Sequence, residues 1–138
     1  MRETDLTSGK VTAVTATFSI VAADPAAGVC GAAVASMYPA VGKVVAFARC
    51  GVGAFCTQHY ANTPWGPRAL DLLASPLLPE AVLAELLRGD DKQDQRQLAI
   101  IDMRGRVAVH NPVNPAPDGE WWGSLSGRFY SCQGNTLV

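Results

Sequence analysis

Thr17 is the residue of this chain whose type and position are best suited to chemistry. It begins a run of apolar and small residues that leads to a tight turn at residues 24–28, and a second run of small residues follows. A threonine at the head of a β-hairpin can present its hydroxyl as a nucleophile. When the same residue carries a free α-amine, with a pKa near 8, that amine can take the hydroxyl proton. The chemistry that this arrangement predicts is cleavage of an amide bond.

Two further side chains of this hairpin could assist such a nucleophile. Ser36 follows the second run of small residues, and Asp24 stands at the end of the first run, just before a proline. Asp24 has two interpretations, as an acid beside the nucleophile or as the residue that forms the turn. Thr17, Asp24 and Ser36 are therefore the candidate catalytic residues.

Polar residues later in the chain could bind a substrate. Gln58 and Asn62 follow a predicted strand, where polar groups could line the mouth of a cleft. Arg68 stands at the start of a predicted helix, where it could bind a substrate carboxylate or lie on the surface. Gln133 and Asn135 lie in the last run of polar and small residues of the printed sequence, YSCQGNTLV.

Residues 1–16 precede Thr17, so its nitrogen is an amide and cannot act as a base. Either this extension is removed, or the true start lies further into the chain, or Thr17 is an ordinary strand residue. We divide the chain into a leader at residues 1–16 and a domain at residues 17–138.

The cysteines do not indicate a metal site. The four of them form no CxxC pair, and they read as buried free thiols. Cys50, Cys56 and His59 could in principle bind a metal ion. However, the two cysteines are too far apart in the sequence for a zinc knuckle, and both have apolar neighbours. The sequence also has no phosphate-binding glycine loop. We expect neither a metal nor a cofactor.

Composition narrows the class of protein. The 138 residues fit one domain, and a net charge of −1 gives no reason to expect nucleic acid as a partner. There is no apolar run long enough for a membrane span and no signal sequence, so we expect a cytoplasmic protein. Hydrophobic residues make up 49% and charged residues 17%, which favours a homo-oligomer because little polar surface is left.

The hydrophobic pattern changes period along the chain. Strands are predicted first, then two helices, then strands again, which indicates an α+β fold rather than alternating β-α-β units. The predicted strands span residues 11–23, 29–35, 44–48, 52–57, 98–103, 107–110 and 129–133. The predicted helices span residues 67–74 and 80–88, and residues 111–122 are expected to be irregular.

Four strings occur in an order that resembles the domain of unknown function family 1028. They are TFSIVAADPAAGVCGAAVAS, AVGKVVAFARCGVGAFCTQ, NTPWGPRALDLL and YSCQGNTLV. That family looks like the N-terminal nucleophile (Ntn) hydrolases, and its own members usually begin with Met directly followed by the threonine that matches Thr17. The resemblance implies an αββα sandwich of antiparallel sheets with a helical pair. It also implies that Gln133 and Asn135 are pocket residues that could donate to an oxyanion.

This chain resembles a truncated and divergent member of that family. Met37 stands where many relatives carry a basic residue, and relatives continue beyond the block that ends the printed sequence. The resemblance implies that only the N-terminal portion of the sandwich is present here. A complementary C-terminal chain, a symmetry mate or dimer packing would supply the rest.

The sequence and the family resemblance leave three functions open. The first is hydrolysis of an amide bond of a small molecule, with Thr17 as nucleophile. The second is a divergent enzyme for a small molecule that uses other cleft residues, such as Cys30, Ser36 or His59. The third is a catalytically silent binding or assembly protein.

Overall fold

The structure, a computed structural model, describes residues 16–113 and 121–137. The predicted leader, apart from Ala16, lies outside the described residues, as do residues 11–15 of the first predicted strand. Residues 114–120 of the segment expected to be irregular also lie outside them.

One sheet, sheet A, is built on the predicted N-terminal hairpin. Its antiparallel order is β2-β1-β8-β7, with β1 at Thr17–Asp24, β2 at Val29–Ser36, β7 at Trp121–Gly127 and β8 at Tyr130–Leu137. Gly28 has a φ of 71°, a conformation that favours glycine and lets β1 turn directly into β2. The hairpin predicted from the sequence is confirmed.

The second sheet, sheet B, has the antiparallel order β3-β4-β5-β6. These strands span Ala46–Arg49, Gly53–His59, Arg96–Asp102 and Val107–His110. Gly53 has a φ of 147°, and a Cβ there would collide with the backbone of β5, so only glycine fits where β4 begins. Strands β4 and β5 therefore approach closely at this end of sheet B.

Two helices cover one face of sheet B, as the helical pattern predicts. They are α2 at Trp65–Leu73 and α3 at Pro79–Leu87, and a short 3-10 helix, η1, follows at Gln93–Gln95. Their apolar side chains share a core with Phe55, Leu98 and Ile100 of the sheet. Leu83 and Leu86, four and seven residues after Pro79, lie on the buried face of α3 because that spacing places side chains on one side of a helix.

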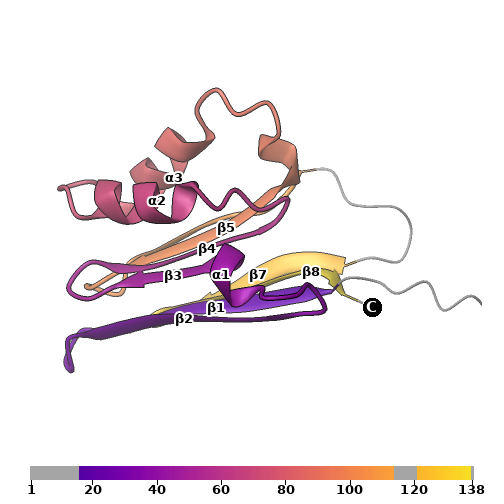
Figure 1. The fold of residues 1–138 in the computed structure, drawn as a ribbon. Coiled ribbons are helices and arrows are strands. Elements are labelled where there is room, and N and C mark those ends of the chain that lie inside the picture. The colour runs from indigo at the N-terminus through magenta and orange to yellow at the C-terminus, as the bar shows by residue number, and fades with distance from the viewer. Residues whose placement is uncertain (1–15, 114–120, 138) are drawn as a thin grey trace, which may run out of the picture.

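The layers run from helices to sheet B to sheet A (Figure 1). A second apolar cluster fills one end of the space between the sheets, and it contains Val21, Ala23, Val45, Ala54, Cys56, Ala99 and Ile101. Alternation along β4 explains both cores: Ala54 and Cys56 belong to the cluster between the sheets, whereas Phe55 belongs to the cluster under the helices. Over residues 16–113 and 121–137, the fold is mixed α+β with two antiparallel sheets and three α-helices.

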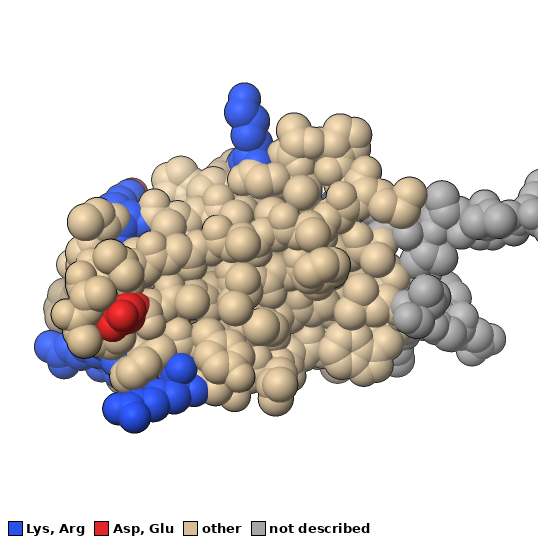
Figure 2. Space-filling view, turned by 90° about the horizontal axis from the view of Figure 1, so that it is seen from below, with Lys and Arg blue, Asp and Glu red and all other residues tan. Residues whose placement is uncertain are grey.

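The outer face of sheet A is apolar and exposed. Figure 2 views the molecule from this side, and almost no charged side chain lies over the middle of the face. Large hydrophobic side chains are exposed on the strands of this sheet, among them Phe18, Val29, Trp121, Leu125 and Tyr130. Among the described residues, α2 and α3 lie on the far side of sheet B, and no helix covers this face (Figure 1). The two sheets thus differ in how their outer faces are covered.

Three predicted boundaries were wrong. Val44 and Val45 were expected in a strand but belong to the short helix α1 at Gly42–Val45, which carries the chain from sheet A to sheet B. Ala40, with a φ of 54°, reverses the chain just before this helix. The last strand continues to Leu137, beyond the predicted end, and Trp121 and Trp122 lie in a strand rather than an irregular segment.

No helix in the described ranges is long and apolar enough to cross a membrane.

Candidate functional site

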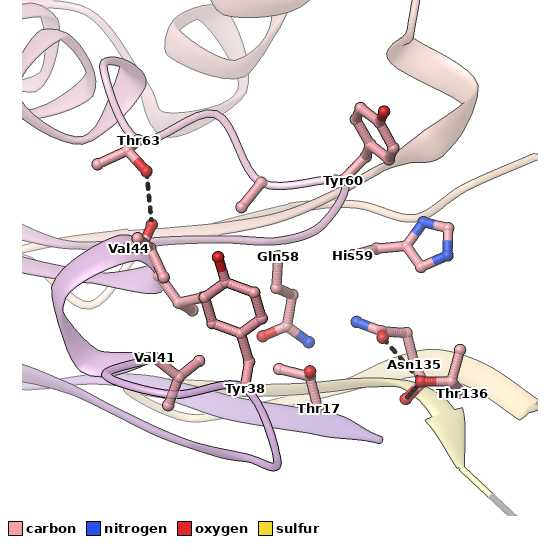
Figure 3. A pocket seen from close by; sticks show the side chains of 12 residues that line it. Thr17, Tyr38, Val41, Val44, Gln58, His59, Tyr60, Thr63, Asn135 and Thr136 are labelled. Carbon is pink, nitrogen blue, oxygen red and sulfur yellow. Dashed lines mark hydrogen bonds between the residues drawn. The ribbon is translucent and has the colours of Figure 1, made fainter. Parts of the chain in front are cut away.

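A cavity of about 670 Å³ opens where β1 begins. Both sheets contribute to its lining, together with α1 and the loop that follows β4 (Figure 3). The lining residues are Thr17, Tyr38, Val41, Val44, Val45, Gln58, His59, Tyr60, Ala61, Thr63, Asn135 and Thr136. A volume of this size is typical of small-molecule sites, which hold roughly 300–1,000 Å³.

Strand register brings three of the predicted residues into one row. Thr17 pairs with Ser36 of β2 on one side and with Asn135 of β8 on the other. The hydroxyl oxygens of Thr17 and Ser36 are 2.9 Å apart, and either can donate to the other. The backbone N–H of Tyr38 also donates to Ser36 Oγ at 3.2 Å, which fixes this hydroxyl beside Thr17. Thr17 itself is buried.

Gln58 faces this row from the opposite sheet, at the end of β4 (Figure 3). Its Oε1 accepts a hydrogen bond from Ser19 Oγ, and Gln133 Nε2 donates to the same serine oxygen at 2.6 Å. Gln58 Nε2 donates to Gln97 Oε1 at 2.8 Å. Side chains of sheets A and B are thereby joined through uncharged groups directly beneath the cavity.

Gln97 is the centre of this polar layer. Its Oε1 accepts from Gln58 and from Asn135 Nδ2, the latter at 3.0 Å, while its Nε2 donates to Asn111 Oδ1 at 2.8 Å and to the carbonyl of Gly134 at 2.9 Å. Asn135 Nδ2 carries two N–H groups, and Gln97 accepts only one. Gln133 Oε1 is buried without a hydrogen-bond partner in the described part of the chain.

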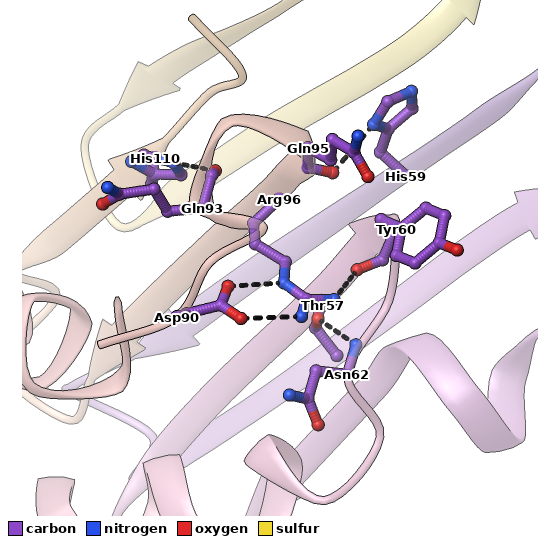
Figure 4. A network of polar contacts seen from close by, with 9 residues as sticks. All are labelled: Thr57, His59, Tyr60, Asn62, Asp90, Gln93, Gln95, Arg96 and His110. Atoms are coloured by element: carbon purple, nitrogen blue, oxygen red, sulfur yellow. Dashed lines mark hydrogen bonds and ion pairs between the residues drawn. The ribbon is translucent and has the colours of Figure 1, made fainter. Parts of the chain in front are cut away.

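The loop after β4 forms the rim of the cavity. His59, which has a φ of 63°, places Nδ1 2.8 Å from the carbonyl of Gln95 and stacks edge-on against Trp122. The backbone N–H of Tyr60 donates to the same Gln95 carbonyl at 3.1 Å. Asn62 donates its backbone N–H to Thr57 Oγ1 at 3.0 Å. These bonds hold the rim against η1 and the end of β4 (Figure 4).

A buried ion pair supports this rim from the helix side of sheet B. Arg96 donates to both carboxylate oxygens of Asp90, at 2.8 and 3.0 Å, and also to the carbonyl of Tyr60 (Figure 4). Its guanidinium lies 5.0 Å from the centre of the Trp65 ring. The hydrogen bonds from Arg96 hold the pKa of Asp90 below its usual value.

The predicted site residues divide into two groups. Thr17, Gln58 and Asn135 line the cavity, with Ser36 hydrogen-bonded to Thr17 and Gln133 one layer deeper.

Other predicted positions lie away from the cavity. Asp24 ends β1, at the opposite end from Thr17, and its Oδ1 accepts from the backbone N–H groups of Ala26 and Ala27, so it forms the turn. Arg68 is on α2, where it pairs with Glu85 at 3.7 Å. Asn62 stands beside the rim but does not line the cavity, and Met37 is 64% exposed and does not line it either.

Several lining residues were not found from the sequence. Val41, Val44 and Val45 form an apolar wall, and their spacing of three and four residues is the signal that predicts one helix face. Gln97 could have been noticed as an amide at the start of an otherwise apolar strand. Tyr38 and Tyr60 offered no such signal, because only the tertiary structure brings their loops together.

The four cysteines were predicted to be buried, but only Cys56 is: Cys50 is exposed, and Cys30 and Cys132 are partly buried. Burial raises the pKa of Cys56 to about 12, so its thiol is not a nucleophile near neutral pH. Cys30 Sγ contacts the carbonyls of Arg49 and Gly53, at the end of the sheets far from Thr17. Within the ranges that the structure describes, no three His, Cys, Asp or Glu side chains gather in a way that could hold a metal ion.

Comparison with known proteins gives the chain a family. Residues 17–138 match the family of unknown function DUF1028. The crystal structure of a Silicibacter pomeroyi protein of that family is similar, with 30% sequence identity and a TM-score of 0.79. The match covers 89% of this chain and 54% of that protein, so this chain spans about half its length. No curated protein matches the sequence. The chain therefore belongs to the family of unknown function DUF1028.

Proposed function

We propose that this protein is an Ntn-hydrolase-like enzyme that cleaves an amide bond of a small molecule, with Thr17 as nucleophile after residues 1–16 are removed. One observation carries the proposal: Thr17 is the first residue of β1 and lines the cavity at that point. The family match also begins at Thr17. Cleavage before this residue would create an α-amine at the cavity, beside the hydroxyl that it must activate.

The reaction would proceed in two steps. The α-amine takes the proton of Thr17 Oγ1 as this oxygen bonds to the amide carbon, and the proton then passes to the leaving amine as the C–N bond breaks. The acyl group is left as an ester on Thr17. A water molecule, deprotonated by the same α-amine, attacks the ester and releases the acid, which returns the hydroxyl to Thr17.

Neighbouring residues have separable roles in this scheme. Asn135 is in register with Thr17, and its second N–H is available to donate to the oxyanion that forms at the amide carbon. Ser36 Oγ, 2.9 Å from Thr17 Oγ1, orients the nucleophile. Gln58 places its amide across the cavity and closes the polar floor. Asp24 and Arg68 have no part in it, because both lie elsewhere in the structure.

The test uses the full chain with a specific protease site placed directly before position 17. Uncut protein should be inactive on a chromogenic anilide, and cutting should start hydrolysis. Thr17→Val, which removes the hydroxyl but keeps the shape, should lower kcat/KM by about four orders of magnitude or more, while Thr17→Ser should retain activity. The rate should rise with pH as an amine of pKa near 8 loses its proton.

Mass spectrometry adds a direct readout. Cut wild-type protein quenched during turnover should gain the mass of the acyl group, and the Thr17→Val protein should not. If uncut protein hydrolyses the anilide as fast as cut protein, the α-amine is not the base and the proposal fails. A loss of activity in Ser126→Ala, a hydroxyl of β7 outside the cavity, would point to a general effect rather than to the site.

A second function, in assembly, is favoured by the apolar outer face of sheet A. Phe18 is 58% and Leu125 70% exposed there, and such a face is normally covered by another layer. We propose that a second polypeptide covers it, either another copy of this chain or a complementary chain. Light scattering should then give a mass above that of the monomer, and Leu125→Lys should reduce it. A monomer at micromolar concentration contradicts this proposal, and Val109→Lys on sheet B is the matched control.

A further inference from the structure

The cavity beside Thr17 has an apolar wall facing its polar floor. Val41, Val44 and Val45 line one side, and Tyr38 stands next to them over Thr17 (Figure 3). The opposite side is polar and consists of Thr17, Gln58, Asn135 and Thr136. A ligand that fills the space must therefore place a reactive polar group at the floor and a larger apolar group against the valines.

The valine wall is fixed by the local fold. Val41 caps the N-terminus of α1, and its carbonyl accepts from the backbone N–H groups of Val44 and Val45 at 3.1 and 3.0 Å. The carbonyl of Val44 is in turn 3.5 Å from Thr63 Oγ1, across the mouth of the cavity (Figure 3). Val45 is buried. The wall is thus formed before any ligand binds, which lowers the cost of binding.

Formal charge is absent from the described lining. None of its twelve residues is Lys, Arg, Asp or Glu, and the polar groups of the floor are neutral amides and hydroxyls. A carboxylate or ammonium group that entered would lose its hydration, and no side chain of the described lining offers it a full opposite charge, which makes its binding costly. An apolar group would instead gain about 25 cal/mol for each Å² removed from water.

Two tyrosines frame the mouth. Tyr38 is 57% and Tyr60 52% exposed, and both line the cavity from opposite sides (Figure 3). Tyr38 can offer an aromatic face to a flat group, and Tyr60 can offer the face that Lys92 Nζ, 4.8 Å from its ring centre, does not cover. Because the ion pair of Arg96 and Asp90 holds the Tyr60 backbone, this side of the mouth is also rigid.

From these features we propose that the acyl group bound beside Thr17 is uncharged and carries an aromatic or branched aliphatic substituent. This inference rests on the proposed function, since it names the class of amide that the same site takes. The amide group lies at the polar floor, and the substituent lies against the valine wall between the two tyrosines.

Two small amides test the inference without turnover. Phenylacetamide is neutral and aromatic, whereas succinamate presents the same primary amide with a carboxylate. Each is titrated into the full-length Thr17→Val protein, and the dissociation constant is measured from NMR shifts of the valine methyl groups. Phenylacetamide should bind at least about tenfold more tightly than succinamate. Equal or tighter binding of succinamate, or no saturable binding of phenylacetamide, overturns the inference.

A charge placed on the wall should reverse the preference. In Val44→Lys, phenylacetamide should bind about tenfold more weakly than to the protein without this change. Succinamate should bind more tightly, because the new cation offers its carboxylate a partner. Val41→Lys is assessed in the same way if Val44→Lys does not fold by circular dichroism. Val29→Lys, the same change at an exposed position that does not line the cavity, should leave both constants unchanged. Unchanged constants in both wall variants would overturn the inference.

These outcomes separate the two proposals. If phenylacetamide binds as expected but cut wild-type protein hydrolyses no amide, the proposed function fails and the binding preference stands. If cut protein hydrolyses the succinamate-type anilide faster than the phenylacetyl anilide, hydrolysis stands and the inference about the acyl group fails.

Discussion

The space between the two sheets has an apolar end and a polar end, although the same strands build both. Strand β1 contributes Val21 to the apolar end and Ser19 to the polar end. Strand β5 likewise contributes Ile101 to the first and Gln97 to the second. The inward faces of β1 and β5 therefore change from hydrophobic to polar side chains as these strands approach the cavity.

The difference shows how a polar site can be buried without ions. Amide side chains both donate and accept, so Gln58 accepts from Ser19 across the gap between the sheets and donates to Gln97 beside it in sheet B. An unpaired polar group in the same place would destabilise the fold, because it would lose its bonds to water. The apolar end supplies stability through burial alone. The polar end fixes side chains around Thr17, and each of its bonds depends on the others.

The largest effect on stability is expected from Gln97→Leu. This change leaves Gln58 Nε2 and Asn135 Nδ2 without their shared acceptor, and it should lower the free energy of unfolding by about 4 kcal/mol. Ile101→Val at the apolar end is the control, with an expected loss of about 1 kcal/mol. Both are measured by urea denaturation. If Gln97→Leu costs less than Ile101→Val, the polar end is not held together by its network.

The second largest effect on stability distinguishes the ion pair at the rim from the neutral hydrogen bonds between the sheets. Asp90→Asn should cost about 2–3 kcal/mol at neutral pH, because Arg96 is buried and loses its charged partner. In the wild type, the pKa of Asp90 in the folded state lies below its unfolded value of about 3.9. Its contribution is therefore present above that value and is lost as the pH falls through the folded-state pKa.

Urea denaturation at several pH values tests this prediction. The cost of Asp90→Asn should shrink below about pH 4 as the wild type loses the ion pair, while the cost of Gln97→Leu, whose partners are neutral amides, should change much less. Asp94→Asn, an exposed carboxylate of η1, is the matched control and should alter stability by no more than about 0.5 kcal/mol. A constant cost of Asp90→Asn down to acid pH would contradict the role given to the ion pair.

A smaller effect is expected where the polar end begins. Ser19→Ala removes the hydroxyl between Gln58 Oε1 and Gln133 Nε2, and it should cost about 2 kcal/mol because both amide atoms then lack that partner. Ser75→Ala, an exposed hydroxyl after α2 that donates to the carbonyl of Leu72, should stay within about 0.5 kcal/mol. Thermal unfolding of the two variants gives the comparison. Equal midpoints would mean that water replaces the Ser19 hydroxyl without loss.

Local patterns in the sequence predicted the helices and strands better than they predicted which residues come together in the folded protein. The N-terminal hairpin and both helices follow from alternation, turn residues and helical spacing, all of which act over a few residues. Asn135 was suggested only through the family resemblance, because its position beside Thr17 depends on pairing between β1 and β8. Such pairing joins residues more than one hundred positions apart, and no local pattern records it.

The predicted site residues that lie away from the cavity have roles that their neighbours in the sequence already indicate. Asp24 before proline is a turn former, and the structure uses it as one. Arg68 at the start of a helix is a surface residue with an acidic neighbour, Glu85. Elsewhere the local pattern was misleading. Val44 and Val45 look like strand residues, but the chain must cross between the sheets there and forms a helix instead.

The smallest effect concerns the thiol of the apolar end. Cys56 lies where Ser19 and Gln58 give way to hydrophobic neighbours, and burial raises its pKa to about 12. The thiolate is the reactive form, so a disulfide reagent at about pH 8 should modify the exposed Cys50 quickly and Cys56 only after unfolding. Cys50→Ser should remove the fast phase. Cys56→Ala should cost only about 1 kcal/mol, because it deletes one small apolar group. Rapid modification of Cys56 in the folded protein would show that water reaches the apolar end, and the two ends would then differ less than their side chains indicate.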